Sequence, residues 1–160
     1  MRSIVVGLGC ALAMATAFIG IGTGKAAELS NVDSPDAGTQ DAHFRKGDHW
    51  VGTYICAQGL TNLDLQIVAA SDGIISDAIF NFEDTRHGTS GAFHMTGTHD
   101  FATHEATFVP GEWIRQPPNF VTVGMKGTVH GATFAGDITM RGCTSFSITR
   151  VASGDPRDKR

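Results

Sequence analysis

The chain has 160 residues, 41% of them hydrophobic, with 12 basic and 16 acidic side chains and a formal net charge of −4 at pH 7. This excess of acid makes nucleic acid or an anionic membrane surface a poor partner, because both require clustered positive charge. The length suits one domain with its own hydrophobic core.

Residues 1–26 are predicted to be a secretory signal peptide. Arg2 is followed by an apolar run, residues 4–21, that contains no acid, and small residues at positions 24–27 offer a cleavage site. The run is too short and too rich in Gly and Ala to predict a membrane span. Lipid attachment at Cys10 is the alternative, which we disfavour because the apolar run continues past this residue. We therefore expect a secreted or periplasmic protein.

Two cysteines remain after such a cleavage, Cys56 and Cys143. Cleavage also removes Arg2 and Lys25 but no acidic residue, which changes the formal charge from −4 to −6. In an exported protein an even pair of cysteines predicts a disulfide, and closing this loop is worth roughly 4 to 5 kcal/mol on the chain-entropy model. A reactive free thiol is the alternative.

Residues 27–47 are predicted to form a flexible leader, because they are rich in Asp, Ser, Gly and Pro and show no apolar periodicity. Residues 152–160 are polar and are predicted to be a disordered tail. The folded domain is expected between them, at residues 48–151.

Apolar and polar residues alternate through this domain with a period of two residues, which indicates half-buried β-strands. Leu63, Leu65 and Ile67 share one face of a predicted strand, for example, while polar residues occupy the other face. The predicted strands centre, in chain order, on Tyr54, Leu65, Phe80, Met95, Phe108, Val123, Phe134 and Ile148. About eight short strands at roughly ten-residue spacing, with Gly-containing turns and no convincing helix, indicate an all-β fold.

We expect these strands to form an antiparallel meander of about eight strands closed into a barrel, with a β-sandwich as the alternative. Pairing of Cys56 with Cys143 would bring the first strand beside the last, as closure of a barrel requires. Closure also removes the exposed strand edges of an open sheet. The barrel is therefore the preferred architecture.

The motif W-x-G-x-Y-x-C-x-Q-G-x-T begins at Trp50, and P-x-x-W-I follows at Pro110. Together these motifs resemble an uncharacterised exported β-domain of bacteria over nearly all of residues 50–150. The resemblance implies the domain limits, and it implies no activity and no catalytic residue. In architecture the chain is also similar to lipocalin- and avidin-type barrels, which have an early Trp near a Gly on the first strand. Likeness of fold does not carry function.

Residues 110–120, PGEWIRQPPNF, are predicted to be the one long irregular connection. Trp113 offers a broad apolar surface, Arg115 a bidentate donor and Glu112 an acceptor. The prolines lower the entropy cost of ordering the segment, and long connections in compact domains are often functional. These three side chains are therefore candidate contacts for a protein partner or a small apolar ligand. In the alternative, Trp113 folds back and plugs one end of the barrel.

Gln58 is a further candidate ligand contact. It lies with Thr61 in the turn-prone sequence AQGLT, where both side chains can form hydrogen bonds at the mouth of a barrel. In the alternative interpretation, both side chains only form hydrogen bonds with the backbone groups of a tight turn.

Seven histidines raise the question of a metal site. His99 and His104 flank a predicted turn at residues 100–103, so we expect them to face each other across a hairpin and to share a Zn²⁺ or Cu²⁺ ion. A third ligand is missing from this pair, although Asp100 or Glu105 is close enough in sequence to approach, and His43 and His49, in or near the predicted leader, could supplement the site. Solvated histidines on a polar face are the simpler interpretation.

No residue pattern predicts catalysis. Asp84, His87 and Ser90 lie together in one loop, but no strand-to-helix elbow presents the serine. We therefore expect a non-enzymatic binding or interaction domain without a cofactor, acting through residues 110–120 or an outer face. A barrel that binds a small molecule or lipid, and a metal-binding protein that uses the histidines, are the alternatives.

Overall fold

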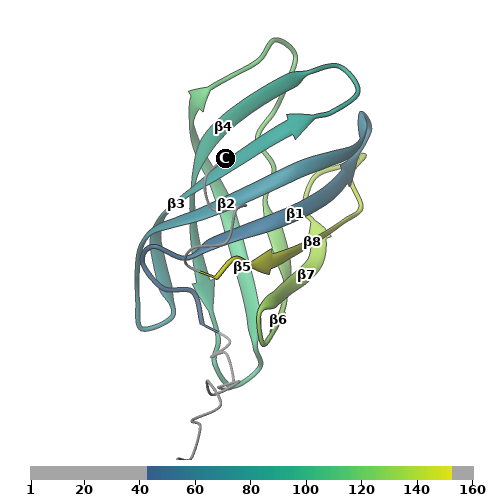
Figure 1. The fold of residues 1–160 in the computed structure, drawn as a ribbon. Helices are drawn as coiled ribbons and strands as arrows, with labels where there is room; N and C mark the ends of the chain where they lie inside the picture. Colours follow the sequence, from purple (N-terminus) through teal and green to yellow (C-terminus); the bar gives the residue numbers. More distant parts are fainter. Residues whose placement is uncertain (1–42, 153–160) are drawn as a thin grey trace, which may run out of the picture. The chain divides into compact units, whose positions relative to one another are not determined.

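The computed structural model describes residues 43–152, which fold into eight antiparallel β-strands (Figure 1). The strands are β1 (His49–Cys56), β2 (Gly59–Ser71), β3 (Ile74–Asp84), β4 (Thr89–His99), β5 (Glu105–Arg115), β6 (Met125–His130), β7 (Thr133–Ile138) and β8 (Ser145–Arg150). The predicted signal peptide, most of the predicted leader and residues 153–160 lie outside the described residues.

The strands follow one another around a closed barrel in chain order. Closure comes from β1, which pairs with both β2 and β8: Trp50 lies opposite Leu65 on one side and Arg150 on the other. The predicted meander barrel is confirmed, and the sandwich alternative is wrong.

The connections of this meander alternate between the two ends of the barrel. We call one end the mouth; it carries the connections at residues 57–58, 85–88, 116–124 and 139–144. The opposite end, the base, carries the connections at residues 72–73, 100–104 and 131–132. Every statement about a site below refers to one of these ends or to the outer face of the strands.

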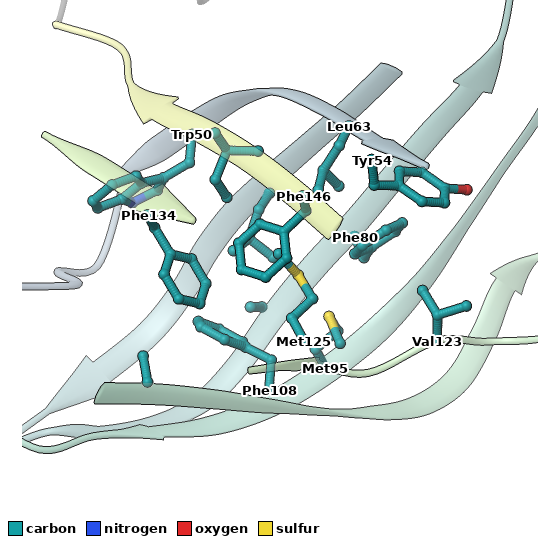
Figure 2. Close-up of a cluster of buried hydrophobic side chains, with 14 of the residues drawn as sticks. Trp50, Tyr54, Leu63, Phe80, Met95, Phe108, Val123, Met125, Phe134 and Phe146 are labelled. Carbon is teal, nitrogen blue, oxygen red and sulfur yellow. The ribbon is translucent and has the colours of Figure 1, made fainter. Parts of the chain in front are cut away.

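Inward side chains fill the barrel. Leu63, Leu65 and Ile67 are buried as the alternation predicts, and the intervening side chains of β2 point outward. Figure 2 shows aromatic rings and methionines from all around the barrel meeting in its interior, among them Phe80 and Phe108, which are almost completely buried. A barrel of eight strands has an interior just wide enough for side chains of this size.

A disulfide joins Cys56, the last residue of β1, to Cys143 in the connection before β8. The backbone N–H of the next residue, Thr144, donates to the carbonyl of Ile55, so the bond lies directly beside the β1–β8 seam. The predicted pairing is confirmed. The disulfide is compatible with an extracellular or periplasmic location, because such bonds persist in oxidising compartments.

The prediction that residues 110–120 form an irregular connection is wrong for its first half, because β5 continues to Arg115. Beyond Phe108, β5 pairs with β4 but no longer with β6, so Pro110 lies where its missing N–H leaves no ladder bond unmade. Register shifts opposite Phe93 absorb the irregularity, as β-bulges do. The irregular connection is instead residues 116–124.

Residues 43–47, which the sequence assigns to the flexible leader, instead pack against the base of the barrel. Phe44 is only 8% exposed, and its ring lies 4.9 Å from Trp50 and 5.1 Å from Phe108, measured between centroids. The backbone N–H of Gly47 donates to the carbonyl of Ile67, which ties the segment to β2. Phe44 therefore supplies the apolar surface that holds residues 43–47 against the barrel.

Within residues 43–152 the chain forms no helix that is long and apolar enough to cross a membrane.

Candidate functional site

A hollow of about 450 Å³ opens at the mouth of the barrel, and we call it the mouth hollow. Its walls come from residues 57–58 after β1, from residues 119–123 of the irregular connection and from residues 140–143 around the disulfide. The rings of Phe82 and Phe93, from β3 and β4, close it toward the core. Segments far apart in the sequence therefore meet here because the meander places their connections at one end.

A polar cluster lies at one side of this hollow. The Gln58 amide nitrogen donates to the Tyr54 hydroxyl oxygen and to Thr61 Oγ1, each at 3.3 Å, and the Thr61 hydroxyl donates to the carbonyl of Gly59 at 3.3 Å. The Tyr54 hydroxyl is also hydrogen-bonded to the side chain of Thr61. Among the described residues, the Gln58 amide oxygen has no donor, so it remains available to accept a hydrogen bond from a ligand.

Tyr54 keeps its proton over the whole physiological range. Burial raises the pKa of Tyr54 to about 12, because the phenolate would lose its hydration, and the hydrogen bonds from Thr61 and Gln58 offset only part of this effect. In Figure 2 the Tyr54 ring and Val123 lie at one end of the buried cluster, with Trp50 and Phe134 at the other. The hydroxyl is thus a donor at the mouth end of the core.

The remaining wall of the mouth hollow is aromatic. The Phe120 ring, from the irregular connection, stacks on Phe82 with centroids 5.3 Å apart and ring planes 18° apart. Trp113 does not line the hollow but supports this wall from behind, with its ring edge-on to Phe93 at 5.2 Å and to Phe82 at 6.3 Å. Around the opening, Val121 and Met140 remain exposed. The hollow therefore has an apolar side and a polar side.

A buried carboxylate ends β3 at the same end of the barrel. Asp84 is 2% exposed, and its two oxygens accept hydrogen bonds from the backbone N–H of Arg86 at 3.0 Å and from His87 Nδ1 at 2.6 Å. The hydrogen bond from His87 holds the pKa of Asp84 below its ordinary value. Both oxygens are already engaged, so this pair organises the β3–β4 turn.

A second hollow, of about 760 Å³, lies on the outer face of β1 to β5, and we call it the outer-face hollow. Its lining combines the apolar side chains of Val51, Leu63 and Phe82 with polar and charged ones: Asn62, Asp64, Gln66, Asn81, Glu83, Ser90 and Arg115. Asp64 is already bonded to His49 Nε2 at 2.7 Å and to the Gln66 amide at 3.3 Å. Charges of both signs therefore line this surface, whereas the mouth hollow has, among the described residues, a single charged side chain, Arg141.

The structure does not bring the four predicted ligand contacts together. Gln58 lies in the mouth hollow. Trp113 points inward against Phe93, as the plug interpretation expects, and Arg115 lies on the outer face, 3.5 Å from Ser90 Oγ. Glu112 is exposed and lines neither hollow.

The predicted arrangement of His99 and His104 is wrong. The register pairs His99 with Ala106, while His104 lies in the turn before β5 with a φ of 60° and its ring 6.5 Å from that of His130. His99 is instead buried in the base, 5.8 Å from the ring of His43. Within residues 43–152, no three His, Cys, Asp or Glu side chains gather closely enough to hold a metal ion.

Sequence patterns alone do not identify three residues that line the mouth hollow: Phe120, Val121 and Arg141. Phe120 lies two residues after Pro118 in the predicted connection, and only the structure shows that its ring stacks on Phe82. No local pattern marks Arg141, because its place in the hollow depends on the disulfide that brings its turn beside β1.

A scan against protein-family models gave no match to this chain, and searches of curated proteins and of solved structures gave none either. The resemblance drawn from the sequence motifs therefore stays a prediction, and the site has to be interpreted from its own geometry.

Proposed function

We propose that this barrel is a secreted or periplasmic, non-enzymatic binding module that holds a small amphipathic molecule in the mouth hollow. The observation that carries the proposal is a hollow of about 450 Å³ with aromatic and aliphatic walls and one polar side. Small-molecule sites commonly have this size and this combination of mostly apolar lining with a few placed polar groups.

The structure favours the mouth over the two surfaces expected from the sequence. Residues 110–115 belong to a strand and Trp113 is partly buried against the core, so this segment offers little free apolar surface. On the outer face, Asp64 is already bonded to neighbours within the barrel. In the mouth, by contrast, the Gln58 amide oxygen is free among the described residues to accept a hydrogen bond from an occupant.

The first test is titration with Nile red, an uncharged apolar dye whose fluorescence increases when it leaves water. We expect saturable binding to the wild-type protein. Val121→Asp should weaken that binding at least tenfold, because it places a carboxylate on the apolar side of the mouth hollow, where desolvating the charge is costly. Val121 is 59% exposed, so the substitution should leave the fold intact.

Val109→Asp is the matched control. Val109 is 56% exposed on β5 and does not line the mouth hollow, so this variant should bind the dye as the wild type does. Absence of saturable binding to the wild-type protein, or equal weakening by both substitutions, would contradict the proposal. Intrinsic tryptophan fluorescence gives a second readout that requires no dye, because one of the two tryptophans, Trp113, packs against Phe93, which lines the mouth hollow.

A further inference from the structure

From the charges around the mouth hollow we infer that its ligand is an amphipathic anion, whose head group is bound by Arg141. This inference rests on the proposed function and adds the chemical class of the ligand. Arg141 is the only charged side chain among the described residues that line the hollow. Every other lining side chain is apolar or uncharged.

No acidic side chain among the described residues neutralises Arg141. Each of the ion pairs found among residues 43–152 involves other residues, and none joins Arg141 to an Asp or Glu. This is notable in a chain with more acidic than basic residues. A guanidinium group beside an apolar surface binds a carboxylate, sulfate or phosphate oxygen pair more strongly than one in open water, since the surroundings screen the charges less.

The disulfide fixes the place of Arg141. Arg141 precedes Cys143 by two residues, so the bond to Cys56 holds this turn beside the end of β1, at one edge of the opening. Because the turn is anchored in this way, less backbone freedom is lost when an anion binds at Arg141, which lowers the entropy cost of binding. The amide nitrogen of Gln58, across the disulfide, is already occupied by Tyr54 and Thr61, so Arg141 supplies the contact to the head group.

Asp84, the buried acid at the mouth, lies on a different part of the barrel from Arg141. Asp84 ends β3, whereas Arg141 lies between β7 and β8, and β1 and β2 separate these strands around the barrel. The Asp84 oxygens are engaged by Arg86 N–H and His87. The head group is thus placed at the seam of β1 and β8, and the apolar chain lies against Phe120, across the hollow.

The test compares three ligands with the same ten-carbon chain and different heads: decanoate, 1-decanol and decyltrimethylammonium, each below its micellar concentration. Displacement of Nile red reports their affinities. We expect decanoate to bind about tenfold more tightly than decanol, the factor expected from one partly exposed charged hydrogen bond, and the ammonium ion to bind most weakly. Decanoate binding should also weaken as NaCl is raised, while decanol binding should not.

Arg141→Gln should remove most of the advantage of decanoate over decanol and leave Nile red and decanol binding unchanged. Arg45→Gln removes the same charge at the base of the barrel and should change none of the affinities. Equal binding of decanoate and decanol in the wild type, or an unchanged preference in Arg141→Gln, would overturn the anion inference and leave the proposed function standing. Failure of Nile red and of all three ligands to bind would overturn the proposed function itself.

Discussion

Phe44→Ala tests whether residues 43–47 belong to the folded barrel. The Phe44 ring is buried and lies within 5.5 Å of four other aromatic rings, measured between centroids: those of Trp50, Phe108, Phe134 and His99. Removing a buried phenylalanine side chain costs about 3 to 5 kcal/mol. Phe44 lies at the end of the barrel, where water can enter the space left behind, so we expect about 3 kcal/mol.

The measurement is the free energy of unfolding from urea denaturation, with tryptophan fluorescence as the probe. Single domains of this size commonly have a free energy of unfolding of about 5 to 15 kcal/mol, so a loss of 3 kcal/mol moves the midpoint clearly. Phe101→Ala is the control: Phe101 contacts the rings of His43 and His99 at the same end but is 46% exposed. It should cost less than half as much.

A loss below about 1 kcal/mol for Phe44→Ala, or one no larger than that of Phe101→Ala, would refute this reasoning. It would mean that the segment contributes nothing beyond an exposed contact. The originally expected leader boundary, at residue 47, would then describe the protein better than the packing of Phe44 does.

Three further predictions concern the disulfide and two titrating groups. Replacing Cys56 and Cys143 together by Ala should lower the free energy of unfolding by about 4 to 5 kcal/mol, measured in urea and matched by reduction of the wild type, whereas a change below 1 kcal/mol would contradict the entropic argument. Burial lowers the pKa of the His99 side chain, so as the pH falls below 6.5 the unfolded chain binds a proton at His99 before the folded protein does. The contribution of neutral His99 to the free energy of unfolding is therefore complete above pH 6.5 and declines below it. Between pH 7.5 and 5, the free energy of unfolding in urea should fall less for His99→Phe than for the wild type, and an equal fall in both would refute this. Tyr54 is the only tyrosine, so the ultraviolet absorbance of the native protein should show phenolate forming near pH 12, and a midpoint near pH 10 would disprove its burial.

The alternation of apolar and polar residues was sufficient to predict the barrel, because each strand has one face in the core and one in water. Leu63, Leu65 and Ile67 show this pattern within a single strand. The cysteines were sufficient for the disulfide, since only two remain beyond the predicted signal peptide. The alternation is a local pattern and the cysteine pair follows from the number of cysteines, so both can be recognised in a single sequence.

The candidate site was predictable only in part. Gln58 was expected at the mouth because its turn follows the first strand, and it lies there. Pro110 suggested a loop, because nothing in the sequence shows that β6 is too short to pair with that part of β5. Arg141 and Phe120 come together only through closure of the barrel and the disulfide, which bring distant connections to one place. No local sequence pattern predicts such contacts between distant connections.

The described chain enters and leaves the barrel at the base. Residue 43 precedes the segment that packs there, and the backbone N–H of Val151 donates to the carbonyl of His49 at the start of β1 (Figure 1). A tag or a second protein joined directly to residue 43 or residue 152 would therefore begin at the face opposite the mouth hollow. A barrel shortened to residues 43–152 could be immobilised through either end with its opening directed toward the solution.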